Sequence, residues 1–300
     1  MSLRYRMAME LVRLSGMKKL FQLPQDELLR KAEQLNRRRQ FRMPTDGKAR
    51  YADRRIEGSH CLVMETQPRK SARALLFLFG GGMILGSDAG DLKVARDVGR
   101  RSGRDVWFPH YPLYTDHCIR DSVKMVYESY RQMLEEYRPE DIAVLGFSSG
   151  AGLALGMCGY NNMQREKLPM PSMIVACSPG NCPADEREYR QMAALNDRDL
   201  LVDVVFMDRI RLIMEHGEPD VPKELISFAL GDYSGAPLTY FYYGGDEVLS
   251  ASAEAFSAAF ARAGARCSVH IEPGMCHCYP MLTFFPEGRR AYEEIVALLS

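Results

Sequence analysis

From residue 61 onward, short apolar runs alternate with longer segments of helical periodicity, which leaves few folds open to the chain. The apolar runs are residues 61–64, 74–79, 106–109, 142–145, 173–177, 238–243 and 267–271. The helical segments are residues 91–101, 119–136, 150–163, 253–263 and 289–299. Buried strands that alternate with amphipathic helices form a mostly parallel sheet covered on both faces. We therefore predict an α/β fold with about eight strands.

Two regions interrupt this alternation. Residues 4–40 have an amphipathic helical pattern broken near Pro24, and residues 41–60 are polar and irregular. Residues 182–235 are charged and mainly helical, although they lie between two predicted strands. A chain of 300 residues suits one large domain with a smaller addition. We therefore divide the chain into an N-terminal helical segment of residues 1–45, a core of residues 46–181 and 236–300, and an insertion of residues 182–235 over one end of the sheet.

Composition argues against several classes of function. Lys plus Arg and Asp plus Glu both number 39, so no net charge favours nucleic acid. The eight cysteines form no CxxC pair and have no histidine at zinc-ligand spacing, so we predict no metal and no cofactor. The start of the chain lacks the apolar core of a signal sequence, and the longest apolar run, residues 74–85, is too short for a bilayer. We expect a cytoplasmic protein with reduced thiols and no stable membrane insertion.

Ser148 is the predicted catalytic nucleophile. It is the central residue of the stretch 146–150, Gly-Phe-Ser-Ser-Gly, which matches the pattern G-x-S-x-G between a predicted strand and a predicted helix. Gly146 and Gly150 lack a Cβ, so the strand and the helix can approach closely and leave the serine hydroxyl exposed. The helix N-terminus favours the negative charge that develops there. Ser149 is the rival within the motif, and a glycine-rich turn that only packs is the other interpretation.

A run of three glycines follows the predicted strand at residues 74–79. The N–H groups of Gly81 and Gly82, together with that of Ser149, are predicted to form an oxyanion hole, with Gly80 supporting the loop. The alternative is a phosphate-binding loop. That alternative requires G-x-G-x-x-G or an ending in G-K-[ST], and the sequence has neither.

The general base and its orienting acid are predicted from their positions after strands. His277 lies in the loop after the predicted strand 267–271, where a base can reach the nucleophile, whereas His270 lies within that strand and is expected to be structural. In enzymes with a G-x-S-x-G nucleophile turn of this kind, the acid lies between the serine and the histidine in the sequence. Asp246, in the turn after residues 238–243, is the predicted acid. Glu247 is its nearest rival, and the alternative role for Asp246 is a helix cap.

These blocks resemble the hormone-sensitive-lipase-like branch of the α/β-hydrolase esterases. The likeness rests on residues 79–82, 146–150, 245–249 and 274–277 in this order, and on Tyr111-Pro112-Leu113 and Asp116-His117, and it extends from about residue 60 to the end. It implies an α/β-hydrolase fold and cleavage of carboxylic esters by a serine nucleophile beneath a helical cap, which residues 1–45 and 182–235 would form. It also suggests a homodimer.

Two departures from the family bear on the substrate. Phe79 stands where the family usually has histidine, and Phe147 stands where it often has Asp or Thr. Met83, Phe147 and Met275 are the residues near the motifs that we expect to line an apolar pocket. We predict a small-molecule ester with a short-to-medium acyl group as the substrate. An amidase or peptidase on the same fold and a non-catalytic small-molecule receptor remain as alternatives, and a membrane-bound lipase is a weaker one.

Overall fold

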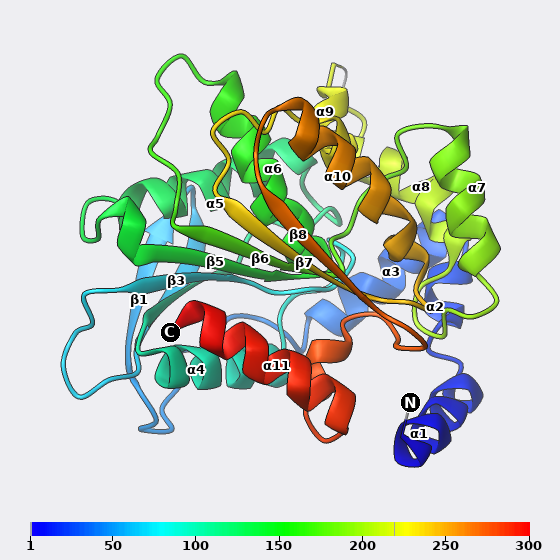
Figure 1. Cartoon of the computed structure of the whole chain (residues 1–300), viewed down its shortest axis with the longest axis horizontal. Coiled ribbons are helices and arrows are strands. Elements are labelled where there is room, and N and C mark those ends of the chain that lie inside the picture. Colours follow the sequence, from blue (N-terminus) through cyan, green and yellow to red (C-terminus); the bar gives the residue numbers. More distant parts are fainter. Residues whose placement is uncertain (1, 219) are drawn as a thin grey trace.

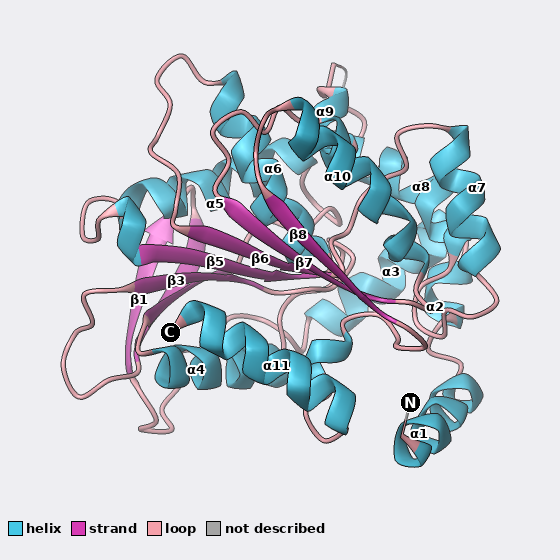
Figure 2. Cartoon of the chain, in the orientation of Figure 1, coloured by secondary structure: helices cyan, strands magenta, loops and turns pink. Residues whose placement is uncertain are grey.

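The computed structural model of the chain describes residues 2–218 and 220–300. Its centre is an eight-stranded sheet in the order β1-β2-β4-β3-β5-β6-β7-β8, in which β1, β2 and β4 pair antiparallel and the other neighbours pair parallel (Figure 1, Figure 2). The strands are β1 (Arg50–Ile56), β2 (Ser59–Glu65), β3 (Ala74–Leu78), β4 (Asp105–Pro109), β5 (Ile142–Phe147), β6 (Met173–Cys177), β7 (Leu238–Gly244) and β8 (Cys267–Glu272). The predicted α/β-hydrolase fold class is confirmed in its sheet and its strand number.

Helices cover both faces of the sheet. The α-helices are α1 (Leu3–Ser15), α2 (Lys19–Gln22), α3 (Gln25–Asn36), α4 (Ala89–Ser102), α5 (Ile119–Met133), α6 (Ser149–Met163), α7 (Glu186–Leu195), α8 (Val204–Glu215), α9 (Lys223–Ile226), α10 (Ala253–Arg262) and α11 (Pro286–Leu299). Short 3-10 helices are η1 (Pro139–Asp141), η2 (Phe228–Leu230), η3 (Val248–Ser252) and η4 (Tyr279–Met281). Figure 1 shows α4 and α11 on one face, and α5, α6 and α10 on the other.

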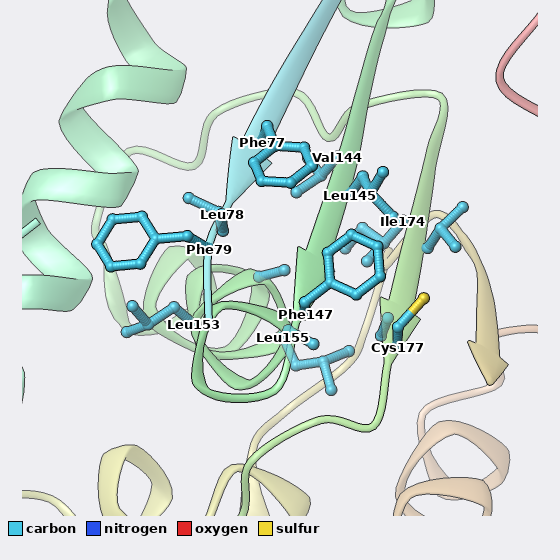
Figure 3. Packing of buried hydrophobic residues seen from close by; sticks show 14 of the residues in the cluster. Phe77, Leu78, Phe79, Val144, Leu145, Phe147, Leu153, Leu155, Ile174 and Cys177 are labelled. Atoms are coloured by element: carbon cyan, nitrogen blue, oxygen red, sulfur yellow. The ribbon is translucent and has the colours of Figure 1, made fainter. Parts of the chain in front are cut away.

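The middle of the sheet forms the core. Every residue of β3, β4 and β5 is buried, as expected for parallel strands covered on both faces. Helix α6 is buried nearly all round, with twelve of its fifteen residues inside. Figure 3 shows apolar side chains of β3, β5, β6 and α6 packed around the end of β5. The point where β5 passes into α6 is therefore a rigid position.

Strand β1 is the main element that the sequence analysis missed. It occupies the edge of the sheet within residues 41–60, which were predicted to be irregular. Its sequence, Arg-Tyr-Ala-Asp-Arg-Arg-Ile, is charged because most of its side chains are exposed. Only Ile56 is buried, so the strand carries almost no apolar pattern from which it could be recognised.

Helices of the two predicted cap segments contact one another across the segments. Residues 4–40 form α1, α2 and α3, with a break near Pro24 as predicted and a second break at Gly16, whose φ is 68°. In Figure 1, α2, α3, α7 and α8 lie together beyond one end of the sheet. Phe21 and Phe206 meet edge to face at 4.8 Å between ring centroids, and Gln22 donates a hydrogen bond to Asp203.

The longest helices described, α5 and α6, have fifteen residues each. Within the part of the chain that the structure describes, no helix has both the length and the apolar character needed to cross a membrane.

Candidate active site

Ser148 stands on the sharp turn from β5 to α6. Its backbone has φ 51° and ψ −123°, a region that non-glycine residues rarely adopt. The two flanking glycines allow this turn: a Cβ on Gly146 would lie 2.6 Å from the backbone of Ala151, and one on Gly150 would lie 2.3 Å from the carbonyl oxygens of Leu78 and Phe79. The strained conformation presents the Ser148 hydroxyl at the end of the strand, as the motif predicted.

His277 reaches Ser148 from the loop after β8. Its Nε2 lies 2.9 Å from the Ser148 hydroxyl oxygen, and its Nδ1 lies 2.5 Å from a carboxylate oxygen of Glu247. These distances form a continuous chain from hydroxyl to imidazole to carboxylate. The sequence analysis predicted two members of this chain, Ser148 and His277.

The third member differs from the prediction: Glu247, rather than Asp246, contacts the imidazole. Glu247 is completely buried, and its other carboxylate oxygen accepts hydrogen bonds from the Gly244 N–H and the Ser178 hydroxyl, both at 2.8 Å. Asp246 is partly exposed and forms an ion pair with Arg198 at 3.5 Å. Both residues lie in the turn after β7, which directs the Glu247 side chain inward to His277 and leaves the Asp246 side chain partly exposed.

Two neighbours influence the protonation of His277. Burial alone would lower the pKa of His277, but the Cys278 sulfur, 3.5 Å from Nε2, and the Glu247 carboxylate outweigh it and hold the pKa well above its usual range. A partly exposed thiol thus lies beside the nucleophile and its base.

The glycine loop lies against the nucleophile, as predicted. A Cβ on Gly80 would be 3.1 Å from the Ser148 Cβ. Gly81 has φ 141° and Gly82 has φ 61°, so both need glycine's conformational freedom. Among the described residues, no hydrogen-bond acceptor is found for the N–H groups of Gly81, Gly82 and Ser149. These three donors are available for an oxygen atom near Ser148.

Tyr111 supports the loop in the absence of the family's usual histidine. Its ring stacks on Phe79 with 4.3 Å between centroids, and its hydroxyl donates a hydrogen bond of 2.6 Å to the Phe79 carbonyl. Phe108 stacks on Phe79 as well, at 5.7 Å. The loop is therefore held by aromatic packing and by one buried hydrogen bond.

A cavity of about 730 Å³ opens over these residues. Gly80, Gly81, Gly82, Ser148, Ser149 and His277 all line it. Most of the other walls are apolar and come from both cap segments, with Leu20, Phe21 and Leu35 on one side and Phe206, Met207, Ile210 and Met214 on the other. The site thus combines a few polar groups with a large apolar enclosure.

Two of the three predicted pocket residues line this cavity. Met83 and Phe147 belong to the lining, although both side chains are almost completely buried and the Phe147 ring packs against Phe77. The prediction for Met275 is wrong: this side chain is buried away from the cavity lining, next to the turn where its carbonyl accepts a hydrogen bond from the Asp246 N–H.

Sequence reasoning also missed residues that hold the site together. Ser178 has φ 49° and hydrogen bonds both to Glu247 and to the Cys278 N–H. The Cys276 N–H donates a hydrogen bond to the Tyr5 hydroxyl oxygen, so helix α1 is tied to the residue before His277. No local pattern marks Ser178 or Tyr5, because their partners are distant in the sequence.

Comparison with known proteins gives the family. Residues 75–281 match the family described as alpha/beta hydrolase fold, which is more than half of the chain. The chain belongs to this family. An acetyl-hydrolase of Streptomyces hygroscopicus is 29% identical over 80% of each chain, and an esterase of Acinetobacter venetianus is 25% identical over 77% of this hydrolase and 76% of its own length.

A solved esterase of the bacterial hormone-sensitive lipase family has the same fold as this α/β hydrolase, with a TM-score of 0.78. It is 23% identical and the alignment covers 97% of this chain and 96% of that one. The predicted resemblance is confirmed, and so is the broader prediction of a hydrolase of the carboxylesterase or lipase type.

Proposed function

We propose that this hydrolase cleaves carboxylic esters with Ser148 as nucleophile, His277 as general base and Glu247 as the carboxylate that orients the base. The observation that carries the proposal is the pair of hydrogen bonds that His277 makes, one to each partner. A serine hydroxyl is a poor nucleophile at neutral pH unless a base removes its proton. A completely buried carboxylate on Nδ1 keeps Nε2 free to accept that proton.

In the first step, the Ser148 oxygen attacks the ester carbonyl carbon while Nε2 of His277 takes the hydroxyl proton. The carbonyl oxygen becomes an oxyanion, which the N–H groups of Gly81, Gly82 and Ser149 stabilise. Loss of one such donor typically raises the barrier by about 3 kcal/mol. The bond to the alcohol oxygen then breaks, and the alcohol leaves with the proton from His277.

In the second step, water attacks the acyl group on Ser148. His277 takes a proton from this water and returns it to the serine oxygen as the acid leaves. No metal or cofactor is needed in either step. The two cap segments act as an apolar cover over the acyl group, since α2, α3 and α8 supply much of the cavity wall.

We infer a neutral ester with an apolar acyl group of short-to-medium length as the substrate. A wall of Leu, Ile, Phe and Met side chains favours a hydrocarbon chain, and the flexible methionines allow different chains to fit.

Replacement of Ser148 with alanine tests the mechanism. We expect Ser148→Ala to reduce hydrolysis of p-nitrophenyl butyrate by about 10⁶-fold, to the residual level of other triad enzymes that lack the nucleophile. The circular dichroism spectrum should not change. Ser234→Ala, in an exposed loop, is the matched control and should retain full activity. Undiminished activity of Ser148→Ala would refute the proposal.

Two further assays separate the alternatives. Matched ester and amide substrates distinguish an esterase from an amidase, because both reactions use the same catalytic groups. A fluorophosphonate probe labels an activated serine, so failure to label Ser148 would favour a non-catalytic receptor.

A further inference from the structure

Helix α1 carries a row of apolar side chains on its outer surface. Leu3 is 71% exposed, Met7 63%, Leu11 69% and Leu14 82%. Steps of four, four and three residues place them on one face of the helix. With Met17, which is 56% exposed, this short segment holds five of the twelve large apolar side chains that are exposed in the described part of the chain. We call Leu3, Met7, Leu11 and Leu14 the apolar row.

The opposite face of α1 is fixed to the protein. Tyr5 is only 2% exposed, contacts Phe285 edge to face at 5.3 Å, and accepts a hydrogen bond from the Cys276 N–H at 2.7 Å. The side chain of Ser2, at the start of the helix, hydrogen bonds to Glu287. The helix therefore holds its apolar row outward, and cannot bury it by rotating without breaking these contacts.

The charges near the row are mostly positive. Residues 2–19 contain five basic side chains and one acidic one, Glu10. The basic residues are Arg4, Arg6, Arg13, Lys18 and Lys19. Lys18 is turned inward and pairs with Asp203 at 3.6 Å, so the other four supply the charge at the surface. On a helical wheel, Arg4 lies on one side of the row, and Arg6 and Arg13 lie on the other together with Glu10, which forms an ion pair with Arg13 at 3.9 Å. Arg6 and Arg13 also line a small groove that contains Asp197 and Asp246, so part of their charge is balanced there.

We propose that the apolar row of α1 docks the protein reversibly on an anionic lipid surface. An exposed apolar face flanked by arginines suits the boundary between headgroups and acyl chains, where both kinds of side chain are favourably placed. A few inserted side chains give weak adsorption along the surface rather than insertion across it. The basic side chains add about 1 kcal/mol each when they lie near anionic headgroups, which is about fivefold in affinity.

The row leads directly to the catalytic cavity. Gly16 and Met17, the next residues after α1, both line that cavity. An ester held in the lipid surface would therefore meet the cavity wall where the docking helix ends. The docking itself does not depend on the proposed catalysis, because adsorption requires no turnover.

Sedimentation with vesicles tests the proposal. We expect the full chain to sediment with vesicles of equal parts phosphatidylcholine and phosphatidylglycerol, less at high salt, and much less with phosphatidylcholine alone. Met7→Gln/Leu11→Gln should lower partitioning by about tenfold or more, since each side chain loses its apolar contact with lipid. Arg4→Gln should lower it about fivefold. Leu212→Gln, 58% exposed on α8, is the matched control and should bind as the parent does.

Several outcomes would overturn the proposal. The proposal fails if the parent protein stays in the supernatant. It also fails if the Met7→Gln/Leu11→Gln variant sediments with the vesicles as much as the parent does. Light scattering gives the third outcome. If the parent is a dimer that binds no vesicles and the double variant is a monomer, the row is instead an interface between two copies of the chain. Hydrolysis of a soluble p-nitrophenyl ester should be equal in all variants, which shows that they fold. Leu14→Gln, at the most exposed position of the row, provides a second and milder variant.

Discussion

Glu247 occupies a position in which its carboxylate is held in place by several contacts. It has no exposed surface, yet it accepts hydrogen bonds from Gly244 and Ser178 and contacts His277. An isolated buried carboxylate would be costly, and these three contacts offset the cost. The imidazole of His277 therefore helps to stabilise the buried carboxylate, and the carboxylate in turn orients the imidazole.

This coupling predicts a change in both rate and pH dependence for Glu247→Gln. His277 must be neutral to accept the serine proton, so kcat/KM falls as the pH drops through the pKa of His277. Glu247 raises that pKa, so its removal should move the acidic limb of the profile to lower pH. We expect kcat to fall by about 10⁴-fold, because the uncharged amide no longer holds the required tautomer.

Asp246→Asn is the control for this prediction. Asp246 contacts Arg198 and has the same charge as Glu247, but it does not touch the imidazole. We expect kcat of Asp246→Asn to stay within about twofold of the parent value, and the acidic limb of its pH-rate profile to stay at the same pH. A pH-rate profile on a soluble ester measures both effects, and a larger loss in Asp246→Asn than in Glu247→Gln would contradict the assignment.

The same pair of residues explains which parts of the site could be predicted. Ser148 and the glycine loop are contiguous motifs, and His277 is distinguished by its place after the last strand. The choice between Asp246 and Glu247 depends on how the turn after β7 directs each side chain, and no sequence pattern records that. Met275 was misplaced for a similar reason, since nearness to the motif does not determine which way a side chain points.

At the scale of elements, the turn between β5 and α6 relies on close backbone contact. A Cβ on Gly150 would lie 2.3 Å from two carbonyl oxygens of the neighbouring strand and loop. These are backbone atoms, so they cannot move aside as a flexible side chain would. Helix α6 also contains Gly159, where an added Cβ would be 3.7 Å from its nearest neighbour, the Gly231 Cα.

We therefore predict opposite effects for two Gly→Ala changes in one helix. Gly150→Ala should destabilise the protein by about 3 kcal/mol and lower esterase activity, because the turn must shift. Gly159→Ala should be neutral or stabilise by up to about 1 kcal/mol, since alanine suits a helix interior better than glycine. Urea unfolding measures both changes, and equal effects at the two positions would argue against the proposed contact.

Central elements were easier to predict than edge elements. Strands β3, β5 and β6 are apolar runs because both of their faces are covered, and their helices show a clear period. Strand β1 has one buried residue, and its sequence gives no signal of its pairing with β2. Helix α1 ends at Gly16. A single glycine among helical residues is not enough to predict such a break from the sequence.

At the scale of the whole molecule, the two cap segments meet above the cavity. Lys18 donates hydrogen bonds to Asn196 and to the Asp199 carbonyl, and Asp199 in turn accepts a hydrogen bond from the Val248 N–H beside Glu247. Polar contacts thus run from the N-terminal segment through residues 182–235 to the turn after β7 that carries Glu247, the proposed orienting carboxylate. Lys18, Asn196 and Asp199 do not line the cavity, so we expect a substitution in the cavity wall to change the preferred acyl group while these contacts and the catalytic groups stay in place. The cover and the proposed chemistry are separable in this sense.

Phe206 on α8 offers a direct test of that separation. Its ring lines the cavity, is 4% exposed and contacts Phe21 of the other segment. Phe206→Ala should make room for a longer acyl group, and each added methylene that becomes buried is worth about 0.8 kcal/mol, or about fourfold in kcat/KM. We expect the ratio of octanoate to butanoate p-nitrophenyl ester hydrolysis to rise, with fluorophosphonate labelling of Ser148 unchanged. Leu212→Ala, exposed on the same helix, should leave the ratio as it is. A fall in activity on both esters without a change in their ratio would mean that Phe206 supports the cover and does not limit acyl length.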